Sequence, residues 1–486
     1  MDLLGRRSLS ETFITALNDP KCVDKKYDNM LYGNLKNAIS SQFIPSKRER
    51  ILRIVVVGVL LALLLVFSFM ATSAQPLEAH ASSQVGDADW WSMFHHDPTH
   101  AGYSMSTAPK TSQILWNYST GEVNGSPAIV DGVVYVASTG TNEVYALNAT
   151  TGIKIWNCTI SSWDCSPAVA GGMVFVGSSD HNVYALNETT GRKVWSYTVL
   201  PGGEENLRVL SSPAVAGGIV FVGSNDNRLY ALNATNGNQL WNYTANSVVE
   251  DPAVANGIVF VGSLDDNVYA LNATTGALIW IYATGGGVFS SPAVVDGIVF
   301  VGSDDHNVYA LNATTGAKVW NYTTYSDVDS SPCVANRMVY IGSDDDFLYA
   351  LRASDGKLVW SFVTGYSEDG SPAVAGGIVF VGSDDFYALN ATTGTVLWSY
   401  SSPNGFTSGS SPAIANGVVF MGGNMLTFFA FGSRSSPPAP LAFTDIVVIV
   451  VVVMVAVVVL TFSVIGATRR TRKGENQDRA PTTPTT

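Results

Sequence analysis

Ala310-Leu-Asn312-Ala-Thr-Thr315-Gly316-Ala-Lys-Val-Trp320 is the clearest copy of an eleven-residue phrase that decides the fold of this 486-residue chain. The pattern A-x-N-x-x-T-G-x-x-x-W occurs seven times, intact or slightly altered, and an eighth tryptophan stands without the phrase. A period of about 40 residues in strand-rich units is typical of a β-propeller. The tryptophans are Trp116, Trp156, Trp195, Trp241, Trp280, Trp320, Trp360 and Trp398.

Each repeat predicts four strands. In the fifth repeat we expect them at residues 291–295, 298–303, 308–311 and 318–322. Pro292 stands at the start of the first strand, where a proline is tolerated. Asp296-Gly297 suits the two left-handed positions of a tight hairpin turn. The matching turn ends in glycine in every other repeat except one, Asn336-Arg337.

The two ends of the repeat region complement one another. There are eight first strands but only seven complete phrases, and residues 411–431 lack a tryptophan strand. We expect residues 113–119, around Trp116, to supply the outer strand of the last blade. A ring closed in this way leaves no free strand edge where its two ends meet. The predicted fold class is therefore all-β, an eight-bladed propeller closed by an N-terminal strand and flanked by two transmembrane helices.

Two long apolar stretches without charged residues, 54–77 and 446–467, predict those membrane spans, which we place at residues 53–74 and 443–467. Basic clusters, residues 47–53 and 469–473, lie on the outer side of each stretch, which places both termini in the cytoplasm. Residues 1–52 and 468–486 are then cytoplasmic, residues 75–431 form an extracytoplasmic propeller at the cell membrane, and residues 432–442 are a Pro/Ser linker. A cleaved signal peptide is the alternative for the first stretch.

The charge of the repeat region limits the kinds of partner that it can bind, and the cysteine count limits the disulfides that it can form. Residues 75–441 hold 30 Asp and Glu against 11 Lys and Arg, which argues against a nucleic-acid partner. Four cysteines are too few for a disulfide framework. Cys158 and Cys165 could form one disulfide, although the connection between them should run from an outer to an inner strand and separate them.

The phrase resembles the tryptophan-docking motif of the pyrroloquinoline-quinone (PQQ) repeat family, A-x-D-x-x-T-G-x-x-x-W. The segment Asp89-Trp-Trp-Ser-Met-Phe-His-His-Asp-Pro-Thr-His-Ala-Gly102-Tyr-Ser104 is also similar to the segment that opens that family's propeller. The resemblance implies that each tryptophan stacks on an alanine and a glycine peptide of a neighbouring motif. Trp320, Ala310, Gly316 and their counterparts would then hold blade to blade.

This chain departs from the family where asparagine replaces the aspartate, and blade six has Arg352 and Asp355 in the phrase. Asparagine can still form the turn. The change also creates N-glycosylation sequons, joined by others on the tryptophan strands. Asparagines that could carry sugar are Asn117, Asn148, Asn157, Asn187, Asn233, Asn242, Asn272, Asn312, Asn321 and Asn390.

The resemblance leaves two functional classes, quinoprotein dehydrogenases that bind PQQ with Ca²⁺ and non-catalytic scaffolds. PQQ is a tricarboxylate and needs basic partners. The segments that lead into the inner strands instead carry Asp164, Glu250 and Asp251, with Arg208 their only base. The loops that connect the strands of the blades are also short, whereas catalytic sites are usually built on longer loops. We therefore expect that the protein is not an enzyme, has no catalytic residues and binds neither PQQ nor calcium as a cofactor.

The favoured hypothesis is a membrane-anchored extracytoplasmic propeller that binds or scaffolds a protein or a cell-surface polymer. A PQQ-dependent quinoprotein dehydrogenase and a cell-surface sensor are the alternatives. His95, His96 and His100 could bind a metal, but packing against the propeller explains them better. The aspartate-rich turns do not have calcium-loop spacing. No metal site is therefore expected.

Overall fold

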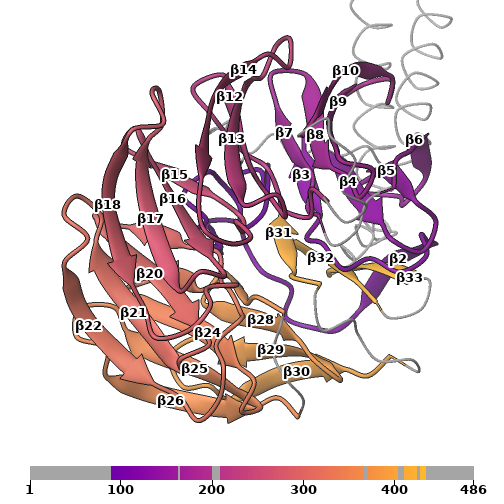
Figure 1. Ribbon diagram of the computed structural model, residues 1–486. Helices are drawn as coiled ribbons and strands as arrows, with labels where there is room; N and C mark the ends of the chain where they lie inside the picture. Colours follow the sequence, from indigo (N-terminus) through magenta and orange to yellow (C-terminus); the bar gives the residue numbers. More distant parts are fainter. Residues whose placement is uncertain are drawn as a thin grey trace, which may run out of the picture. The chain divides into compact units, whose positions relative to one another are not determined.

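The computed structural model describes residues 89–161, 165–199, 208–365, 370–402, 410–423 and 427–433. These residues form an all-β propeller of eight blades, which confirms this part of the predicted fold (Figure 1). No helix in the described part of the chain is long and apolar enough to cross a membrane. The described part does not include the membrane spans predicted at residues 53–74 and 443–467, the cytoplasmic segments 1–52 and 468–486, or the linker 432–442 beyond its first two residues.

Blades 1 to 4 each contain four antiparallel strands that run from the ring axis outward. Blade 1 has β3 (Ala128–Val130), β4 (Val133–Ser138), β5 (Glu143–Asn148) and β6 (Lys154–Thr159). Blade 2 has β7 (Ala168–Ala170), β8 (Met173–Gly177), β9 (Asn182–Asn187) and β10 (Lys193–Thr198). Blade 3 has β11 (Ala214–Ala216), β12 (Ile219–Ser224), β13 (Arg228–Asn233) and β14 (Gln239–Thr244). Blade 4 has β15 (Ala253–Ala255), β16 (Ile258–Ser263), β17 (Asn267–Asn272) and β18 (Leu278–Ala283).

The remaining blades continue the same order. Blade 5 has β19 (Ala293–Val295), β20 (Ile298–Ser303), β21 (Asn307–Asn312) and β22 (Lys318–Thr323). Blade 6 has β23 (Cys333–Ala335), β24 (Met338–Ser343), β25 (Phe347–Arg352) and β26 (Leu358–Val363). Blade 7 has β27 (Ala373–Ala375), β28 (Ile378–Gly382), β29 (Phe386–Asn390) and β30 (Val396–Tyr400), with β1 (Tyr103–Ser104) parallel to β27. Blade 8 has β31 (Ala413–Ala415), β32 (Val418–Gly422), β33 (Thr427–Phe431) and β2 (Ile114–Ser119).

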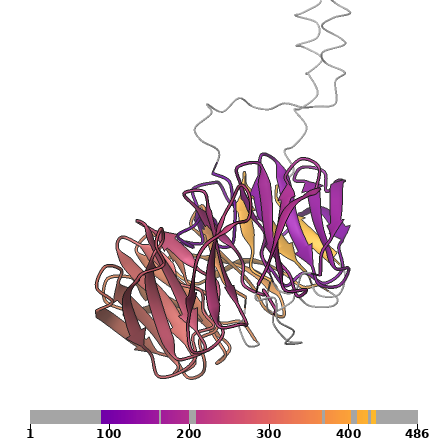
Figure 2. The same cartoon turned by 45° about the horizontal axis from the view of Figure 1, so that its top comes forward.

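Blade 8 closes the ring as the sequence predicts. Its outer strand β2 comes from the N-terminal side of the repeats and pairs antiparallel with β33, so that Trp116 lies opposite Ala430. In both ribbon views the yellow C-terminal strands accordingly lie beside the indigo and purple N-terminal ones (Figures 1 and 2). Backbone hydrogen bonds between the two ends of the propeller therefore hold the ring shut.

The hydrophobic core lies between neighbouring blades. The second strand of each blade is an apolar run buried on both faces, as in Ile298–Ser303, because each sheet is covered by a blade on either side. The outer strands instead alternate, and in β22 only Trp320 is buried. A register shift just before each of these tryptophans, at Val319 in blade 5, marks a β-bulge. Such a bulge re-aims the following side chain.

Each outer-strand indole lies against the next blade. Trp320 packs over Gly356 and donates its indole N–H to the carbonyl oxygen of Ala353, 2.8 Å away. The same pair of contacts recurs for every tryptophan from Trp116 to Trp360. Trp398 faces blade 8, which lacks the phrase, and donates instead to the carbonyl of Pro109 at 3.1 Å.

Candidate functional site

Residues 89–104, which we call the leading segment, lie across the ring axis. The innermost strands of six blades each donate their central backbone N–H to a carbonyl of this segment, at 2.5–2.9 Å. The donors are Ile129, Val169, Val254, Val294, Val334 and Val374. Trp91 is fully buried, and Met93 and Phe94 nearly so. The leading segment is thus part of the core and joins successive blades along the axis.

The three histidines of the leading segment have separate surroundings. His95 and His100 are completely buried beside the ring of Phe94, and burial lowers the pKa of His95 to about 3 and of His100 to about 4. Both imidazoles are therefore neutral at pH 7. His96 is paired with Asp89, 2.8 Å away; burial lowers its pKa, but Asp97 and Asp89 outweigh this and raise it above its usual value.

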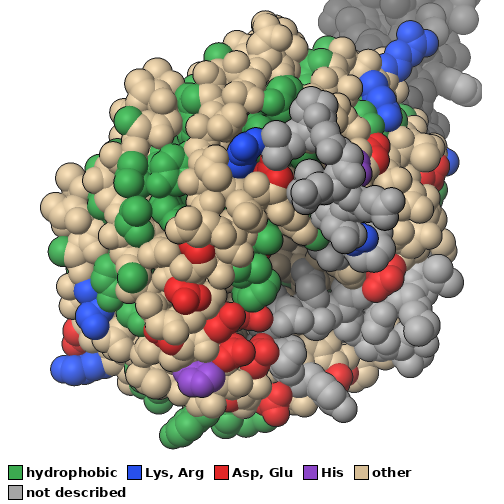
Figure 3. Space-filling view, in the orientation of Figure 1, with side chains coloured by type: hydrophobic (Ala, Val, Ile, Leu, Met, Phe, Trp, Pro, Cys, Tyr) green, Lys and Arg blue, Asp and Glu red, His purple; other side chains and the backbone are tan. Residues whose placement is uncertain are grey.

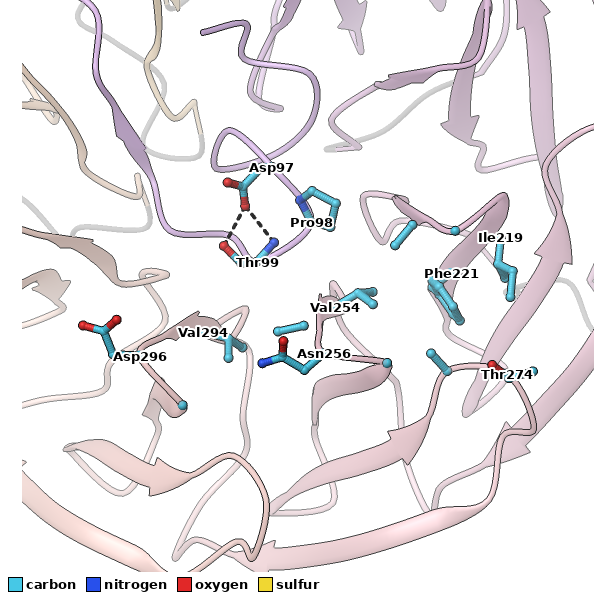
Figure 4. A pocket seen from close by; sticks show the side chains of 16 residues that line it. Asp97, Pro98, Thr99, Ile219, Phe221, Val254, Asn256, Thr274, Val294 and Asp296 are labelled. Atoms are coloured by element: carbon cyan, nitrogen blue, oxygen red, sulfur yellow. Dashed lines mark hydrogen bonds between the residues drawn. The ribbon is translucent and has the colours of Figure 1, made fainter. Parts of the chain in front are cut away.

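A pocket of about 580 Å³ lies between the leading segment and the hairpin turns of blades 3 to 5 (Figure 4). Asp97 lies at its edge, and its carboxylate accepts hydrogen bonds from the backbone N–H and the hydroxyl of Thr99, at 2.8 and 2.6 Å. That carboxylate therefore holds the local turn. Asp296, on the hairpin of blade 5, is the other acidic side chain in the pocket lining.

A belt of hydrogen bonds surrounds the axis near the opposite ends of the innermost strands. The serine that precedes the proline of each blade donates its backbone N–H to the serine hydroxyl of the next blade, as Ser331 does to Ser371 at 2.9 Å. Equivalent bonds join blade 1 to 2, 2 to 3, 5 to 6 and 7 to 8, at 2.9–3.0 Å. In blade 4 the repeat is broken, because Asp251 replaces the serine and accepts the N–H of Ser212 at 2.6 Å.

Asp251 and its neighbour Glu250 are carboxyl groups with unusual pKa values. Burial, together with the charges of Asp251 and Asp329, raises the pKa of Glu250 to about 8. Burial raises the pKa of Asp251 to about 6, although hydrogen bonds from Ser212 and nearby serines oppose it. At neutral pH Glu250 is mostly protonated. It can therefore donate a hydrogen bond while its neighbour carries the negative charge.

Further carboxylates on blades 4 to 6 are linked to this pair through Asp329, which acts on both Glu250 and Asp304. Burial and the charges of Asp327, Asp266 and Asp305 raise the pKa of Asp304. Asp327 also pairs with His306, at 3.0 Å. Acidic side chains gather beside the central hollow of the face in Figure 3. We call this set the acidic mouth: Glu250, Asp251, Asp266, Asp304, Asp305, Asp327 and Asp329.

In blades 2 to 6, one aspartate in the turn between the second and third strands has a structural role that was not predicted from the sequence. Asp305 accepts a hydrogen bond from the hydroxyl of Tyr309, at 2.5 Å, and from the N–H of Gly285 in the preceding connection, at 2.7 Å. Equivalent Asp–Tyr pairs occur in blades 2, 3, 4 and 6. These Asp–Tyr pairs could have been predicted from the sequence, because a tyrosine follows the aspartate by four residues in each of these turns. These turns therefore fasten the connections between blades.

The acidic mouth does not fit PQQ. Three more carboxylates would approach groups that already repel one another, and Glu250 and Asp304 have raised pKa values for that reason among others. No group of three or more His, Cys, Asp or Glu side chains in the described ranges is arranged to hold a metal ion. His95, His96 and His100 belong to no such group.

The disulfide considered between Cys158 and Cys165 is not formed, and both thiols are free. Cys158 lies on β6, at the outer edge of blade 1, whereas Cys165 is buried where blade 2 begins near the axis. The Cys165 sulfur accepts the N–H of Gly177 at 3.1 Å, which is the contact that a serine hydroxyl makes in blades 3, 5, 6 and 8. Cys158 thus belongs to the outer strand of blade 1 and Cys165 to the axial start of blade 2.

The sequon asparagines fall into two structural groups. Those on the tryptophan strands, Asn117, Asn157, Asn242 and Asn321, are exposed. Those in the docking phrase are half-buried and hold its turn; the side-chain oxygen of Asn312 accepts hydrogen bonds from Thr314 and Thr315 at 2.9–3.0 Å. The strand asparagines are therefore more accessible for modification.

Comparisons with known proteins agree on the fold. The family model of the outer membrane protein assembly factor BamB matches residues 105–248, 244–331 and 325–435. No curated protein sequence is significantly similar to the chain. Among solved structures, BamB from Moraxella catarrhalis is 18% identical with a TM-score of 0.57, covering 67% of this chain and 98% of that one.

Dehydrogenases of the same architecture are equally similar. The quinohemoprotein alcohol dehydrogenase from Comamonas testosteroni is 15% identical with a TM-score of 0.59, covering 72% of this chain and 82% of its own. A europium-containing methanol dehydrogenase is 14% identical with a TM-score of 0.60, covering 71% and 98%. At this level of identity the similarity shows the propeller fold and does not distinguish scaffold from enzyme.

Proposed function

Because the chain belongs to the repeat family of the outer membrane protein assembly factor BamB, whose model matches most of its length, we propose that it is a non-catalytic propeller that binds a protein or a cell-surface polymer. Glu250 and Asp251 carry the proposal. Asp251 breaks the serine belt of the other blades, and Glu250 replaces the serine found just before it in blades 3, 5, 6 and 8. A departure of this kind at an axial mouth, with nothing in the fold that requires it, supports a binding role.

The chemistry of the mouth indicates what it would recognise. Carboxylates with raised pKa values attract cationic groups, and a protonated Glu250 adds a hydrogen-bond donor. A protein meets both requirements when a lysine or arginine side chain supplies the cation and a nearby carbonyl oxygen supplies the acceptor, and a polymer meets them with amino and hydroxyl groups. A redox cofactor with three carboxylates supplies acceptors but no cation.

A substitution that restores the repeat tests this role. In E250S/D251S, blade 4 receives the two serines found in blades 3, 5, 6 and 8, so its belt can form as it does there. Cross-linking of the full chain in its native membrane should yield partners with the wild type that are reduced at least five-fold with the variant. E122Q, which removes an exposed charge elsewhere, is the control. An unchanged set of cross-linked partners with E250S/D251S would refute a binding role for the mouth.

The alternative of a quinoprotein dehydrogenase has its own test. The full chain would be incubated with PQQ and Ca²⁺, and dye reduction measured over a panel of alcohols and sugars. We expect no PQQ-dependent turnover, because the acidic mouth repels the cofactor. Turnover that survives removal of free PQQ would overturn the non-catalytic assignment.

We further propose that two transmembrane helices, at residues 53–74 and 443–467, hold the propeller outside the cell membrane with both termini in the cytoplasm. Exposed strand sequons are then available for glycosylation. A mobility shift after deglycosylation that disappears in N117Q/N157Q/N242Q/N321Q would support this placement. Labelling of an engineered propeller cysteine only from the cytoplasmic side would contradict it. The rival role of cell-surface sensor would require cytoplasmic partners of residues 1–52.

A further inference from the structure

Blade 6 departs from the repeat at two neighbouring positions where it acquires arginines. Arg337 occupies the second position of the first hairpin turn, and Arg352 occupies the asparagine position of the docking phrase. The two are adjacent, since Arg352 pairs with Met338 in the sheet and the carbonyl of Arg337 accepts the N–H of Ala353 at 2.9 Å. The turn position is glycine in all other blades: Gly132, Gly172, Gly218, Gly257, Gly297, Gly377 and Gly417.

Arg337 has no structural reason to be there. Its φ of 65° lies in the left-handed region, where a non-glycine residue costs on the order of 1 kcal/mol. Its side chain is exposed, and within the described ranges its guanidinium has neither an ion-pair nor a hydrogen-bond partner. Arg352 differs, because its Nη1 lies 3.0 Å from Asp355 Oδ2 and this pair replaces the Asn–Thr contact of the other phrases.

Both arginines line a groove of about 910 Å³ between blades 5 and 6. Its floor is apolar and includes Phe300, Val334 and Met338. The groove has the volume of sites that bind small organic molecules. Asp296 is the one acidic side chain in the lining. It belongs to the blade 5 hairpin, whereas both arginines belong to blade 6.

We propose that this groove binds a small amphiphilic anion, with an aromatic or alkyl body over Phe300 and Met338 and a carboxylate or phosphate on Arg337. A guanidinium presents paired N–H donors that match both head groups, and no residue of the described ranges occupies those of Arg337. An apolar surface beside a free cation, in a region whose residues 75–441 are otherwise strongly acidic, is complementary to this class of ligand. The site is separate from the acidic mouth and does not depend on the proposed function.

The residues at equivalent positions of the other blades suggest a substitution that should not disturb the fold. R337G installs the residue of the other seven blades at a left-handed position, so it should fold at least as well as the wild type. R192Q removes an exposed arginine of blade 2 and serves as the matched control. The probes are 4-phenylbutyrate, 4-phenylbutyl phosphate and the neutral 4-phenylbutanol. Each is titrated by calorimetry against the full chain in nanodiscs of neutral phospholipid.

We expect at least one of the two anions to bind the wild type and R192Q alike, and to bind R337G at least ten-fold more weakly. The alcohol should bind the wild type at least ten-fold more weakly than that anion. The ranking of carboxylate against phosphate identifies the head group. Equal binding to R337G and wild type, equal binding of the alcohol, or no binding of either anion below 10 mM, roughly the weakest useful affinity, would each overturn the proposal.

Discussion

At the scale of the residue, the indole–glycine contact joins the blades. A Cβ on Gly316 would lie 2.7 Å from Trp280 Cδ2, and the residue has a φ of 69°. Both the space and the backbone conformation therefore require glycine. Gly297, in a hairpin turn, has a similar φ of 77° but nothing within 4 Å of a Cβ. The two glycines share their backbone requirement and differ only in the packing of the indole.

This difference predicts the cost of two substitutions. Gly316→Ala should lower the free energy of unfolding by about 2–4 kcal/mol, because backbone strain adds to displacement of the indole. Gly297→Ala should cost about 1 kcal/mol from strain alone. Urea unfolding of the full chain, followed by near-ultraviolet circular dichroism, measures both. Equal losses would show that indole packing contributes little.

The buried histidines predict a loss of stability in acid. Their folded-state pKa values, about 3 for His95 and about 4 for His100, lie below the ordinary 6.5. The unfolded chain therefore binds more protons, and stability falls as the pH drops from 6.5 toward 4, by on the order of 2 kcal/mol per histidine. His100→Leu should flatten this dependence, measured as the urea midpoint at a series of pH values. His306→Gln, at an exposed position, should leave it largely in place.

At the scale of the element, the connection from β14 to β15 contains a carboxyl group, Glu250, whose ionisation is unfavourable in the folded protein. The folded-state pKa of Glu250, about 8, is above its ordinary 4.5. The unfolded chain therefore loses its proton first, and the group destabilises the fold progressively as the pH rises from 4.5 to 8. A strand connection that served only to join blades would not need such a residue, since serine fills this position in blades 3, 5, 6 and 8.

Glu250→Gln should consequently stabilise the protein at high pH. We expect little difference from the wild type near pH 4.5 and a gain on the order of 2 kcal/mol at pH 8. The measurement is thermal unfolding of both proteins across this range. Glu122→Gln removes the same charge at an exposed site and should give no such trend. A gain that is constant with pH would mean that packing, not ionisation, changed.

At the scale of the whole molecule, the ring closes by three sets of contacts. Strand β2 pairs with β33, Trp116 packs over Gly152, and the leading segment accepts hydrogen bonds from six blades. The serine belt adds a hydrogen bond from the hydroxyl of Ser126 to the carbonyl of Ser411, 285 residues away in the chain. Since each blade is held by both neighbours, loss of one junction should weaken the entire ring.

Trp116→Ala tests this closure. Although Trp116 has no complete phrase, we expect its loss to destabilise the chain by about 3–5 kcal/mol, as much as Trp320→Ala in the middle of the repeats. Both are measured by thermal unfolding of the full chain. A much smaller effect for Trp116→Ala would show that the ring is stable when open at blade 8.

The period, the turn residues and the count of first strands against complete phrases determined the blades and their closure from sequence alone. These are local or periodic signals, so one repeat predicts the next. Tertiary structure was needed to bring the charge of Asp329, at the start of blade 6, to Glu250 of blade 4 in the acidic mouth. It also placed Arg337 beside an apolar groove between blades 5 and 6. Such neighbours come from different blades and meet only when the ring has closed, because each contact spans whole repeats of the chain.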